Sequence, residues 1–374
     1  MTDLSLSQEQ RMLADSVRRY VERGYDAQRR EASLAHPQGC LPETWRDFGD
    51  FGWLGLPLSE ADGGMGGSLA DVCLVSEELG RGAVNEPFIA CAVLANPVLA
   101  QMAPAPVKAR WLSALGDGSR RFALSHAPGL TAVADGDGVR VSGQAALVLG
   151  GAGADGYLLA TDPQADGTAV LVLVEVGVPG LTAEVLSLYD GQRVARLHLD
   201  RVPVQESLWR GPGAQLQAGV ARVLARAALA HCAETVGAMQ AAYEITLDYL
   251  KTRKQFGRAL SANQVVQHRL VDLMVEIEEA RALTRAAAGV LDDPASAEAL
   301  RLRYGAAAKA CVAHAARLVW KEAVQLHGAI GMTQEYQVGQ YVKRLAAATT
   351  LFGSEEAHLE RLAAVSLGYV AASA

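Results

Sequence analysis

The 374-residue chain is poor in cysteine and aromatic residues and has no long uninterrupted apolar run. Its five cysteines are scattered, and none lies at a Cys-x-x-Cys or Cys/His spacing that would indicate a metal site. We therefore expect reduced thiols that fill small apolar spaces in a cytoplasmic protein. Because no run of about 18 apolar residues occurs, a membrane-spanning helix is not expected.

The chain also lacks a block of basic residues. Its formal net charge is −7, with 34 Lys and Arg against 41 Asp and Glu. Nucleic acid is therefore a poor candidate for a partner, since phosphate contacts require clustered Lys and Arg. The N-terminal residues show no basic-then-apolar signal pattern, and they predict an amphipathic helix capped by Ser5 or Ser7.

Half of the residues are hydrophobic, which is enough for a core shared among two or three domains. Residues 1–117 predict an N-terminal helical domain, because apolar residues recur there at spacings of three and four. Helices are expected over Arg11–Val21, Glu43–Phe51, Leu69–Leu79 and Ala90–Met102. Gly80 is expected to end the third. The glycine-rich segment 51–68 is more typical of a helix-to-helix loop than of a phosphate cradle, because it lacks the Lys-Ser/Thr of a P-loop.

Residues 118–212 predict a middle antiparallel β domain, a small barrel or sandwich. Helical periodicity disappears there, and β-prone runs such as TAVLVLVEV alternate with Asp-Gly turns. Residues 213–374 are again helical and rich in alanine, and helices of such length must bury one another's apolar faces. A C-terminal four-helix bundle is expected over residues 214–250, 263–290, 296–324 and 333–349, with a last helix near 355–371. The predicted fold class is α+β, multidomain.

The junction at residues 249–272 lies between the first two long helices. We expect Gly257 to end one helix and Asn263 to cap the next. Arg253 can offer a forked donor to a phosphate, and Phe256 a flat apolar face. The alternative is a basic helix end with an aromatic residue packed against it, and the junction taken alone favours this alternative.

A second candidate stretch runs from Gln325 to Glu356. It starts at the end of an apolar helix and breaks at Gly328 and Gly331, where the absence of a Cβ lets backbone approach something flat or charged. Gln325 adds an amide that can both donate and accept. The alternative is an ordinary helix end followed by a turn.

Four motifs, together with the order of helical, β and helical segments, resemble the acyl-CoA dehydrogenase family. They are GLPLSEADGGMGG (55–67), VPV (202–204), TRKQFG (252–257) and QLHGAIGMTQEY (325–336). The resemblance spans essentially the whole chain, and the last two motifs at this separation are specific to the family.

The resemblance implies an FAD cofactor and a role for each matched residue. Arg253 and Gln255 would bind the FAD pyrophosphate of a neighbouring subunit, Phe256 would pack by the adenosine, and Gln264 would lie near the same nucleotide. The segment from the other motif would receive FAD across the subunit interface through Gln325, Leu326, Gly328, Ala329 and Gly331. One departure is Ala329, where the family usually has a second glycine. Helix ends, bare amides and a guanidinium suit a diphosphate.

The catalytic positions depart further from the family, whose members abstract the proton α to the thioester with a glutamate. Phe352 stands at the usual position of that base, and a phenyl ring cannot take a proton. In other members the base lies on the first bundle helix, where this chain has Ala227. Ala228 follows at a position where an arginine often approaches the substrate. No catalytic residue is therefore expected.

The β domain departs as well. The loop that contacts flavin and acyl-CoA in the family corresponds to residues 126–133, of which only Pro128-Gly129 matches. The strand that faces the flavin ring reads Leu147-Val148-Leu149, whose side chains carry no hydrogen-bond donor.

Four other titratable residues are candidates for a displaced function. Glu355 and Glu356 are interpreted either as shifted bases or as acidic residues in the first turn of the last helix. His126 is a candidate near the flavin edge, whereas His327 is expected to serve the structure.

The pattern resembles the small-subunit class of heteromeric bacterial acyl-CoA dehydrogenases, of the pimeloyl-CoA dehydrogenase small-subunit kind, active in fatty acid or steroid catabolism. The resemblance implies α,β-dehydrogenation of an acyl-CoA by an α2β2 assembly, in which this chain lacks the base and supplies the trans half of the FAD site to a second subunit. One alternative is a homo-oligomeric enzyme with a relocated base. Another is a flavin-free interaction or regulatory protein on the same fold.

Overall fold

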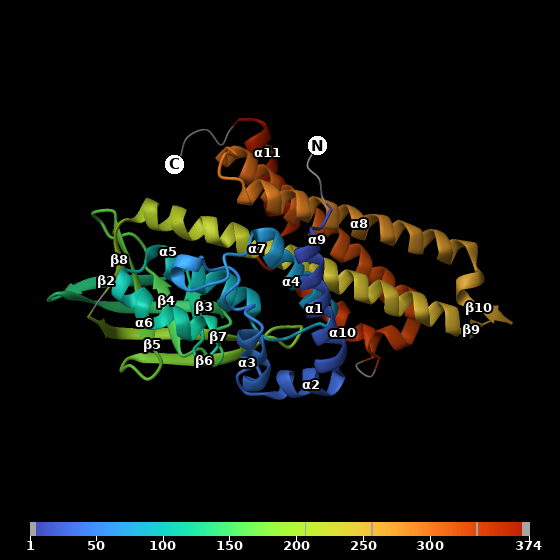
Figure 1. The fold of residues 1–374 in the computed structure, drawn as a ribbon, viewed down its shortest axis with the longest axis horizontal. Helices are drawn as coiled ribbons and strands as arrows, with labels where there is room; N and C mark the ends of the chain where they lie inside the picture. Colours follow the sequence, from blue (N-terminus) through green and yellow to red (C-terminus); the bar gives the residue numbers. More distant parts are fainter. Residues whose placement is uncertain (1–4, 206, 256, 334–335, 369–374) are drawn as a thin grey trace. The chain divides into compact units, whose positions relative to one another are not determined.

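The computed structural model describes residues 5–205, 207–255, 257–333 and 336–368 (Figure 1). The chain divides into two compact units, each assembled from separate stretches of sequence. The first contains Met1–Arg30, Leu69–Val84 and Ala228–Ser373, and the second contains Glu31–Ser68 and Asn85–Ala227. The sequence predicted three consecutive domains with boundaries at residues 117 and 212. Those boundaries stay a prediction.

The N-terminal helices of the first unit are α1 (Gln8–Gly24) and α4 (Leu69–Arg81). Ser7 caps α1, because its hydroxyl accepts from the Gln10 amide while the Gln10 side chain accepts from the Ser7 amide. The choice between Ser5 and Ser7 is thereby settled in favour of Ser7. Helix α2 (Ala27–Ala35) leads from the first unit to the second.

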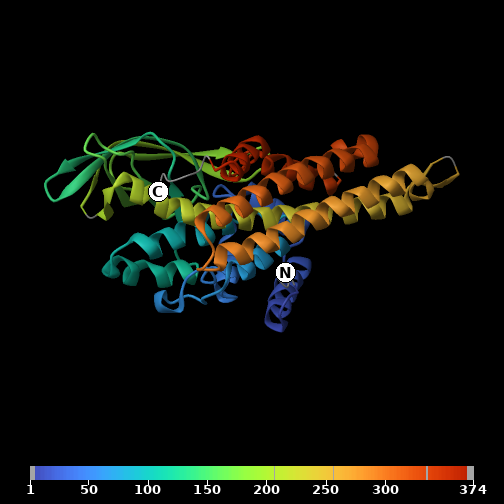
Figure 2. The same cartoon turned by 90° about the horizontal axis from the view of Figure 1, so that it is seen from above.

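Long helices form the rest of the first unit. They are α7 (Gly213–Thr252, from Ala228 on), α8 (Gln264–Asp292), α9 (Glu298–His327), α10 (Val338–Ala348) and α11 (Glu355–Ser366). The end of α7 and the start of α8 run side by side to a common tip (Figure 2). The helical C-terminal part expected from the alanine-rich periodicity is confirmed.

Helices α4 and α7 touch through their backbones. A Cβ at Gly80 of α4 would lie 1.9 Å from the Glu234 carbonyl oxygen, and a Cβ at Gly237 of α7 would lie 1.8 Å from that of Glu77. Gly80 was expected to end its helix, but α4 continues to Arg81. That expectation was wrong because this glycine serves the contact between helices rather than a helix stop.

The second unit holds shorter helices and the β structure. Its helices are α3 (Pro42–Asp50), α5 (Asn96–Met102) and α6 (Ala105–Gly116), with a 3-10 turn at Glu60–Asp62 and a π-helical segment at Ile89–Ala95. The segment 51–68 is a loop between helices, as the sequence indicated. Gly64 in this loop packs against the Gly55 carbonyl, where a Cβ would lie only 2.6 Å away.

Two four-stranded sheets follow in the second unit. The first has the order β1 (Phe122–Ser125), β4 (Gly156–Ala160), β5 (Thr168–Glu175), β8 (Ser207–Pro212). The second has the order β2 (Leu130–Asp135), β3 (Gly138–Leu149), β7 (Arg193–Val204), β6 (Leu181–Ser187). Of the barrel and the sandwich expected from the sequence, the open sheets favour the sandwich. The pairing is antiparallel except between β1 and β4, which are parallel, contrary to a fully antiparallel domain.

The core of this sandwich is drawn from both sheets. Leu159 and Val172 of the first sheet and Val141 and Leu197 of the second are fully buried in one apolar cluster. Alternate residues of β2 and β7 face this cluster, as the two-residue period of a strand requires. Among the described residues, no helix is long and apolar enough to span a bilayer.

The glycine contact between α4 and α7 makes a testable prediction. Gly237→Ala should lower the free energy of unfolding by about 3 kcal/mol or more, because the new methyl group would overlap backbone that cannot move aside. Gly305→Ala in α9 is the matched control, since nothing lies within 4 Å of its Cβ position. That change should stabilise the protein by up to about 1 kcal/mol through helix propensity. Urea unfolding of both variants measures the contrast, and equal stabilities would contradict the contact.

Candidate functional site

The TRKQFG motif forms a small hairpin at the tip of α7 and α8. Helix α7 ends at Thr252, and β9 (Lys254–Gln255) pairs with β10 (Arg258–Ala259). Gly257 lies in the turn with a φ of +79°, which favours glycine. The sequence-based view that Gly257 ends the helix was wrong, because the helix stops earlier and this glycine serves the hairpin. Phe256 lies outside the described residues.

Asn263 stands at the N-cap position of α8 but makes no side-chain cap. Its Oδ1 accepts from the Arg258 guanidinium at 2.5 Å, and its Nδ2 donates to the Leu260 carbonyl at 3.0 Å. The expected capping role is therefore replaced by a role in holding the second strand of the hairpin to the start of α8.

Three predicted ligand-binding side chains of this junction are exposed. Arg253, Gln255 and Gln264 each have an exposed side chain, and within the described part of the chain none of these three side chains makes a hydrogen bond or ion pair. Neighbouring polar residues do find partners: Gln267 donates to the Ser261 carbonyl, and Arg269 pairs with Glu322 at 3.3 Å. The three residues thus keep their donors available for another molecule.

The QLHGAIG motif bends α9 into a 3-10 turn, Gly328–Met332. Gly328 ends the helix with a φ of +66°, and nothing lies within 4 Å of its Cβ position. Gly331 is buried, and a Cβ there would lie 2.9 Å from the Cβ of His327. Gln325 and Ala329 are exposed on the two sides of this bend, whereas Leu326 is buried.

Leu326 joins the two motifs. It packs in one cluster with Leu250 at the end of α7 and Leu270 at the start of α8, and Leu260 of the junction packs against them. The Tyr249 ring stacks on the His327 ring with 4.5 Å between centroids. The structure therefore brings Arg253, Gln255 and the bend of α9 to one end of the helical bundle.

His327 is held by the structure, as expected. Its Nδ1 donates to the Ala323 carbonyl at 2.8 Å, and burial lowers its pKa, so the ring is neutral and fixed. Tyr249, which orders this ring, was missed by sequence reasoning. The only sequence feature that marked Tyr249 was its place one helical turn before the basic motif. Aromatic residues at such positions are also common in ordinary cores, so the feature is not specific.

This end of the bundle suits an elongated anionic ligand. It combines an exposed unpaired guanidinium, exposed amides and a glycine bend without side-chain cover. A guanidinium and side-chain amides recognise a diphosphate through charge-assisted hydrogen bonds, and a glycine lets it approach the backbone closely. The residues that the sequence assigned to FAD are thus chemically fit for that cofactor.

Phe352 occupies a strained position in the loop before α11. Its φ is +59°, in the left-handed region that side chains other than glycine rarely adopt. Its carbonyl accepts from Nε2 of the buried His358 at 2.9 Å, and its ring lies 5.3 Å from the ring of His231 on α7. The position that the sequence comparison assigned to the base therefore holds an apolar ring packed against an imidazole.

His231 is a buried titratable group that sequence reasoning missed. Burial lowers its pKa well below 6.5, and the positive charges of Lys309 and Arg344 act in the same direction. Lys309 is itself buried, and its Nζ donates to the Ala348 carbonyl at 3.1 Å. A neutral imidazole is therefore the stable form in the folded protein.

The acidic residues after Phe352 serve the last helix. Ser354 caps α11, and Glu355 forms an ion pair with Arg317 of α9 at 2.8 Å and lies 3.3 Å from His314. Glu356 is exposed, and backbone and Ser354 hydrogen bonds lower its pKa. Of the two interpretations, the structure favours acidic residues in a first helical turn over a displaced base.

The remaining candidates lie in the second unit or at its edge. Ala227 is fully buried and Ala228 partly buried on α7, so neither offers a polar group. His126 is exposed beside Pro128 and Gly129. In β3, Val148 is buried in the sandwich core while Leu147 is 46% exposed, so these side chains are divided between the two faces of their strand.

Comparison with known proteins gives consistent matches. The family model "Acyl-CoA dehydrogenase, N-terminal domain" matches residues 7–119, and "Acyl-CoA dehydrogenase, C-terminal domain" matches residues 219–367. The acyl-CoA dehydrogenase IpdE2 of Mycobacterium tuberculosis is 31% identical over 356 residues, which cover 95% of this chain and 96% of that protein.

Solved structures share the fold over nearly the full length. A Tcur3481–Tcur3483 steroid ACAD variant has a TM-score of 0.86 at 30% identity, and the match covers 98% of this chain and 100% of that chain. A glutaryl-CoA dehydrogenase from Mycobacterium smegmatis in complex with FADH2 has a TM-score of 0.87 at 22% identity, covering 99% and 97%. The second likeness supports the fold alone.

The buried imidazole of His231 predicts a pH dependence of stability. Above about pH 6.5 the residue is neutral in both the folded and the unfolded chain. Below that pH the unfolded chain binds a proton that the folded chain does not, because the folded pKa is lowered. Stability should therefore fall by up to about 1.4 kcal/mol per pH unit from this residue, until the folded pKa is reached.

Unfolding in urea at pH 7.5 and 5.5 measures this dependence. In His231→Leu, the free energy of unfolding should fall less between pH 7.5 and pH 5.5 than in the wild type. The remaining fall comes from other buried histidines such as His358. The control Leu229→Ala removes buried volume from the same helix without removing a titrating group. It should lower stability equally at both pH values, and a wild-type slope in His231→Leu would contradict the assignment.

Proposed function

This chain belongs to the acyl-CoA dehydrogenase family, and on that premise we propose that it is the base-lacking subunit of a heteromeric FAD-dependent acyl-CoA dehydrogenase. The reaction class is α,β-dehydrogenation of an acyl-CoA thioester. The second subunit of this assembly, in the proposal an α2β2 tetramer, contributes the catalytic base. The enzyme works in the cytoplasm, in keeping with five free cysteines in the chain.

The observation that carries the proposal is a contrast between two sets of residues: those at the positions expected for the base, and those expected to bind FAD. Phe352 and Ala227 stand at the positions of the base, and neither can accept a proton. Glu355, the nearest acidic residue along the chain, is committed to Arg317. By contrast, Arg253, Gln255 and Gln325 are exposed, with no partner among the described residues.

FAD is the cofactor of the family, and when bound it accepts the hydride from the β-carbon of the substrate. In the proposed assembly, Arg253 and Gln255 hold the pyrophosphate of an FAD seated mainly in the partner subunit, with Gln264 beside the nucleotide. Gln325 and the Gly328–Met332 turn, which contains Ala329, would face the same cofactor. The pyrophosphate would then be neutralised by a guanidinium that pairs with no carboxylate in the described part of its own chain.

One comparison supports an assembly of unlike chains that acts on a steroid or fatty acyl substrate, and a second supports the reaction class. The Tcur3481–Tcur3483 steroid ACAD is named for two components, and 30% of its matched residues are identical to this chain. The full-length match to IpdE2, an acyl-CoA dehydrogenase, supports the reaction class. We infer the same kind of pairing for this chain.

The test is to purify the chain alone and together with a co-expressed second acyl-CoA dehydrogenase subunit. Flavin absorbance and acyl-CoA-dependent dye reduction are then measured for both samples. We expect both signals only in the pair. Arg253→Ala should weaken flavin retention at least about tenfold, since it removes charge-assisted hydrogen bonds. The control Arg303→Ala removes an exposed arginine of α9 and should leave flavin and turnover unchanged.

Each other outcome has a distinct meaning. Flavin bleaching by acyl-CoA with this chain alone would overturn the proposal and favour a homo-oligomeric enzyme with a relocated base. Absence of flavin from both samples would favour an interaction or regulatory protein on this fold. Equal flavin retention by Arg253→Ala and wild type would remove this arginine from the cofactor site.

A further inference from the structure

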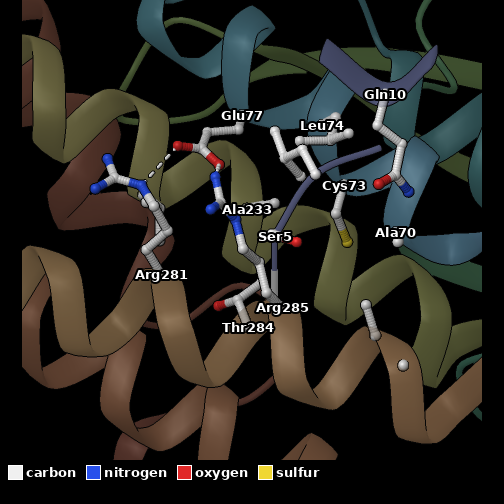
Figure 3. Close-up of a pocket in the computed structure, with 14 residues that line it drawn as sticks. Ser5, Gln10, Ala70, Cys73, Leu74, Glu77, Ala233, Arg281, Thr284 and Arg285 are labelled. Carbon is white, nitrogen blue, oxygen red and sulfur yellow. Dashed lines mark hydrogen bonds and ion pairs between the residues drawn. The ribbon is translucent and has the colours of Figure 1, made fainter. Parts of the chain in front are cut away.

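A pocket of about 150 Å³ lies within the first unit, apart from the residues assigned to FAD and from Phe352. Its walls come from α4, α7 and α8, and Leu6 and Gln10 close it from the N-terminal side. Figure 3 shows an uneven lining. Glu77, Arg281 and Arg285 gather on one side, while Cys73 and Ala70 lie on the other.

Arg281 on the polar side is fully committed to the protein. Its Nε donates to Glu77 at 2.8 Å and one terminal nitrogen donates to Gln240 at 2.9 Å, and the other pairs with Glu278. Its side chain is only 13% exposed. This arginine fixes Glu77, and each of its three nitrogens already makes a contact within the protein.

Arg285 lies one helical turn further along α8, and its donors are not committed in this way. Its nearest approach to Glu77 is 3.7 Å, beyond hydrogen-bond distance, and its buried Nε has no acceptor among the described residues. Buried guanidinium donors are normally satisfied, so an acceptor from outside the chain is the missing partner. A carboxylate or similar anion in the pocket would supply it.

The other side of the pocket is apolar. The apolar residues of the lining are Leu74, Ala233, Val236 and Ala288, together with Cys73, whose thiol is buried. Gln10 also borders this side, but its amide nitrogen donates to Asp71 and its oxygen accepts from the Ser7 amide. An engineered apolar cavity of about 150 Å³ holds a benzene-sized molecule, so the volume suits roughly six to eight non-hydrogen atoms.

We propose that this pocket is a binding site for a short-chain monocarboxylate. The carboxylate accepts from Arg285, whose guanidinium makes no hydrogen bond to Glu77 at 3.7 Å and whose Nε has no acceptor among the described residues. The alkyl chain lies against the apolar wall formed by α4 and α7. A small inorganic anion would satisfy Arg285 but leave that wall without contact, so an amphipathic ligand fits better. The site is separate from the proposed FAD edge and does not depend on it.

Isothermal titration of the full-length protein with hexanoate tests the proposal, with the neutral isostere hexanamide as the ligand control. Hexanoate should bind at least about tenfold more tightly than hexanamide at the same ionic strength, because only the anion forms charge-assisted hydrogen bonds. Arg285→Met, which keeps an apolar stem, should lower hexanoate affinity to that of the amide. Arg303→Met should bind hexanoate like the wild type.

A second variant probes the apolar side. Ala70 is partly exposed at the start of α4, so Ala70→Leu can narrow the pocket without disturbing the core, and it should abolish binding of hexanoate. Unchanged melting temperatures without ligand verify that the variants fold. Equal affinity of hexanoate and hexanamide, or unchanged affinity in Arg285→Met, would overturn the proposal. Inorganic phosphate binding more tightly than hexanoate would also overturn it, in favour of a simple anion site.

Discussion

Direct backbone contact between α4 and α7 is the constraint on which the first unit depends. Because Gly80 and Gly237 carry no Cβ, each helix lies against a carbonyl of the other. This contact fixes neighbouring carboxylates, and each of them holds a further helix: Glu77 binds Arg281 of α8, Glu78 binds Arg18 of α1, and Glu234 binds Arg344 of α10. The absence of a methyl group at these two positions thus allows three ion-paired contacts to converge on one crossing. The same crossing forms a wall of the pocket in Figure 3.

Two regions of the helical bundle differ in how their polar side chains are placed. At the shared tip of α7 and α8, polar side chains are exposed and the glycine bend of α9 is supported from behind by Leu326 and Tyr249. At the loop before α11, polar groups turn inward: His358 binds a carbonyl and Glu355 binds Arg317. The first arrangement leaves its donors exposed, whereas the second directs its polar groups to partners within the chain.

The sequence predicted the features that depend on local pattern. Apolar spacing located the helices, and the paired motifs at 252–257 and 325–336 identified the family. It did not predict features that depend on distant neighbours. The hairpin at Lys254–Ala259 contains Gly257, and the contact between α4 and α7 depends on Gly80. The sequence pattern alone predicted that each of these glycines ends a helix. The parallel pairing of β1 with β4 and the burial of His231 arise from residues far apart in the chain, so no local signal marked them.

The backbone around Phe352 is held from outside by His358, which binds the carbonyl of residue 352 rather than its side chain. Ser354 caps α11 and fixes the residues that follow, and this contact does not involve the side chain of residue 352 either. The loop can therefore keep its shape while the side chain at this position changes, particularly to asparagine or aspartate, which tolerate a left-handed backbone better than phenylalanine. Position 352 is thus a natural attachment point for a small spectroscopic reporter, whose signal would follow the loop without redesigning it.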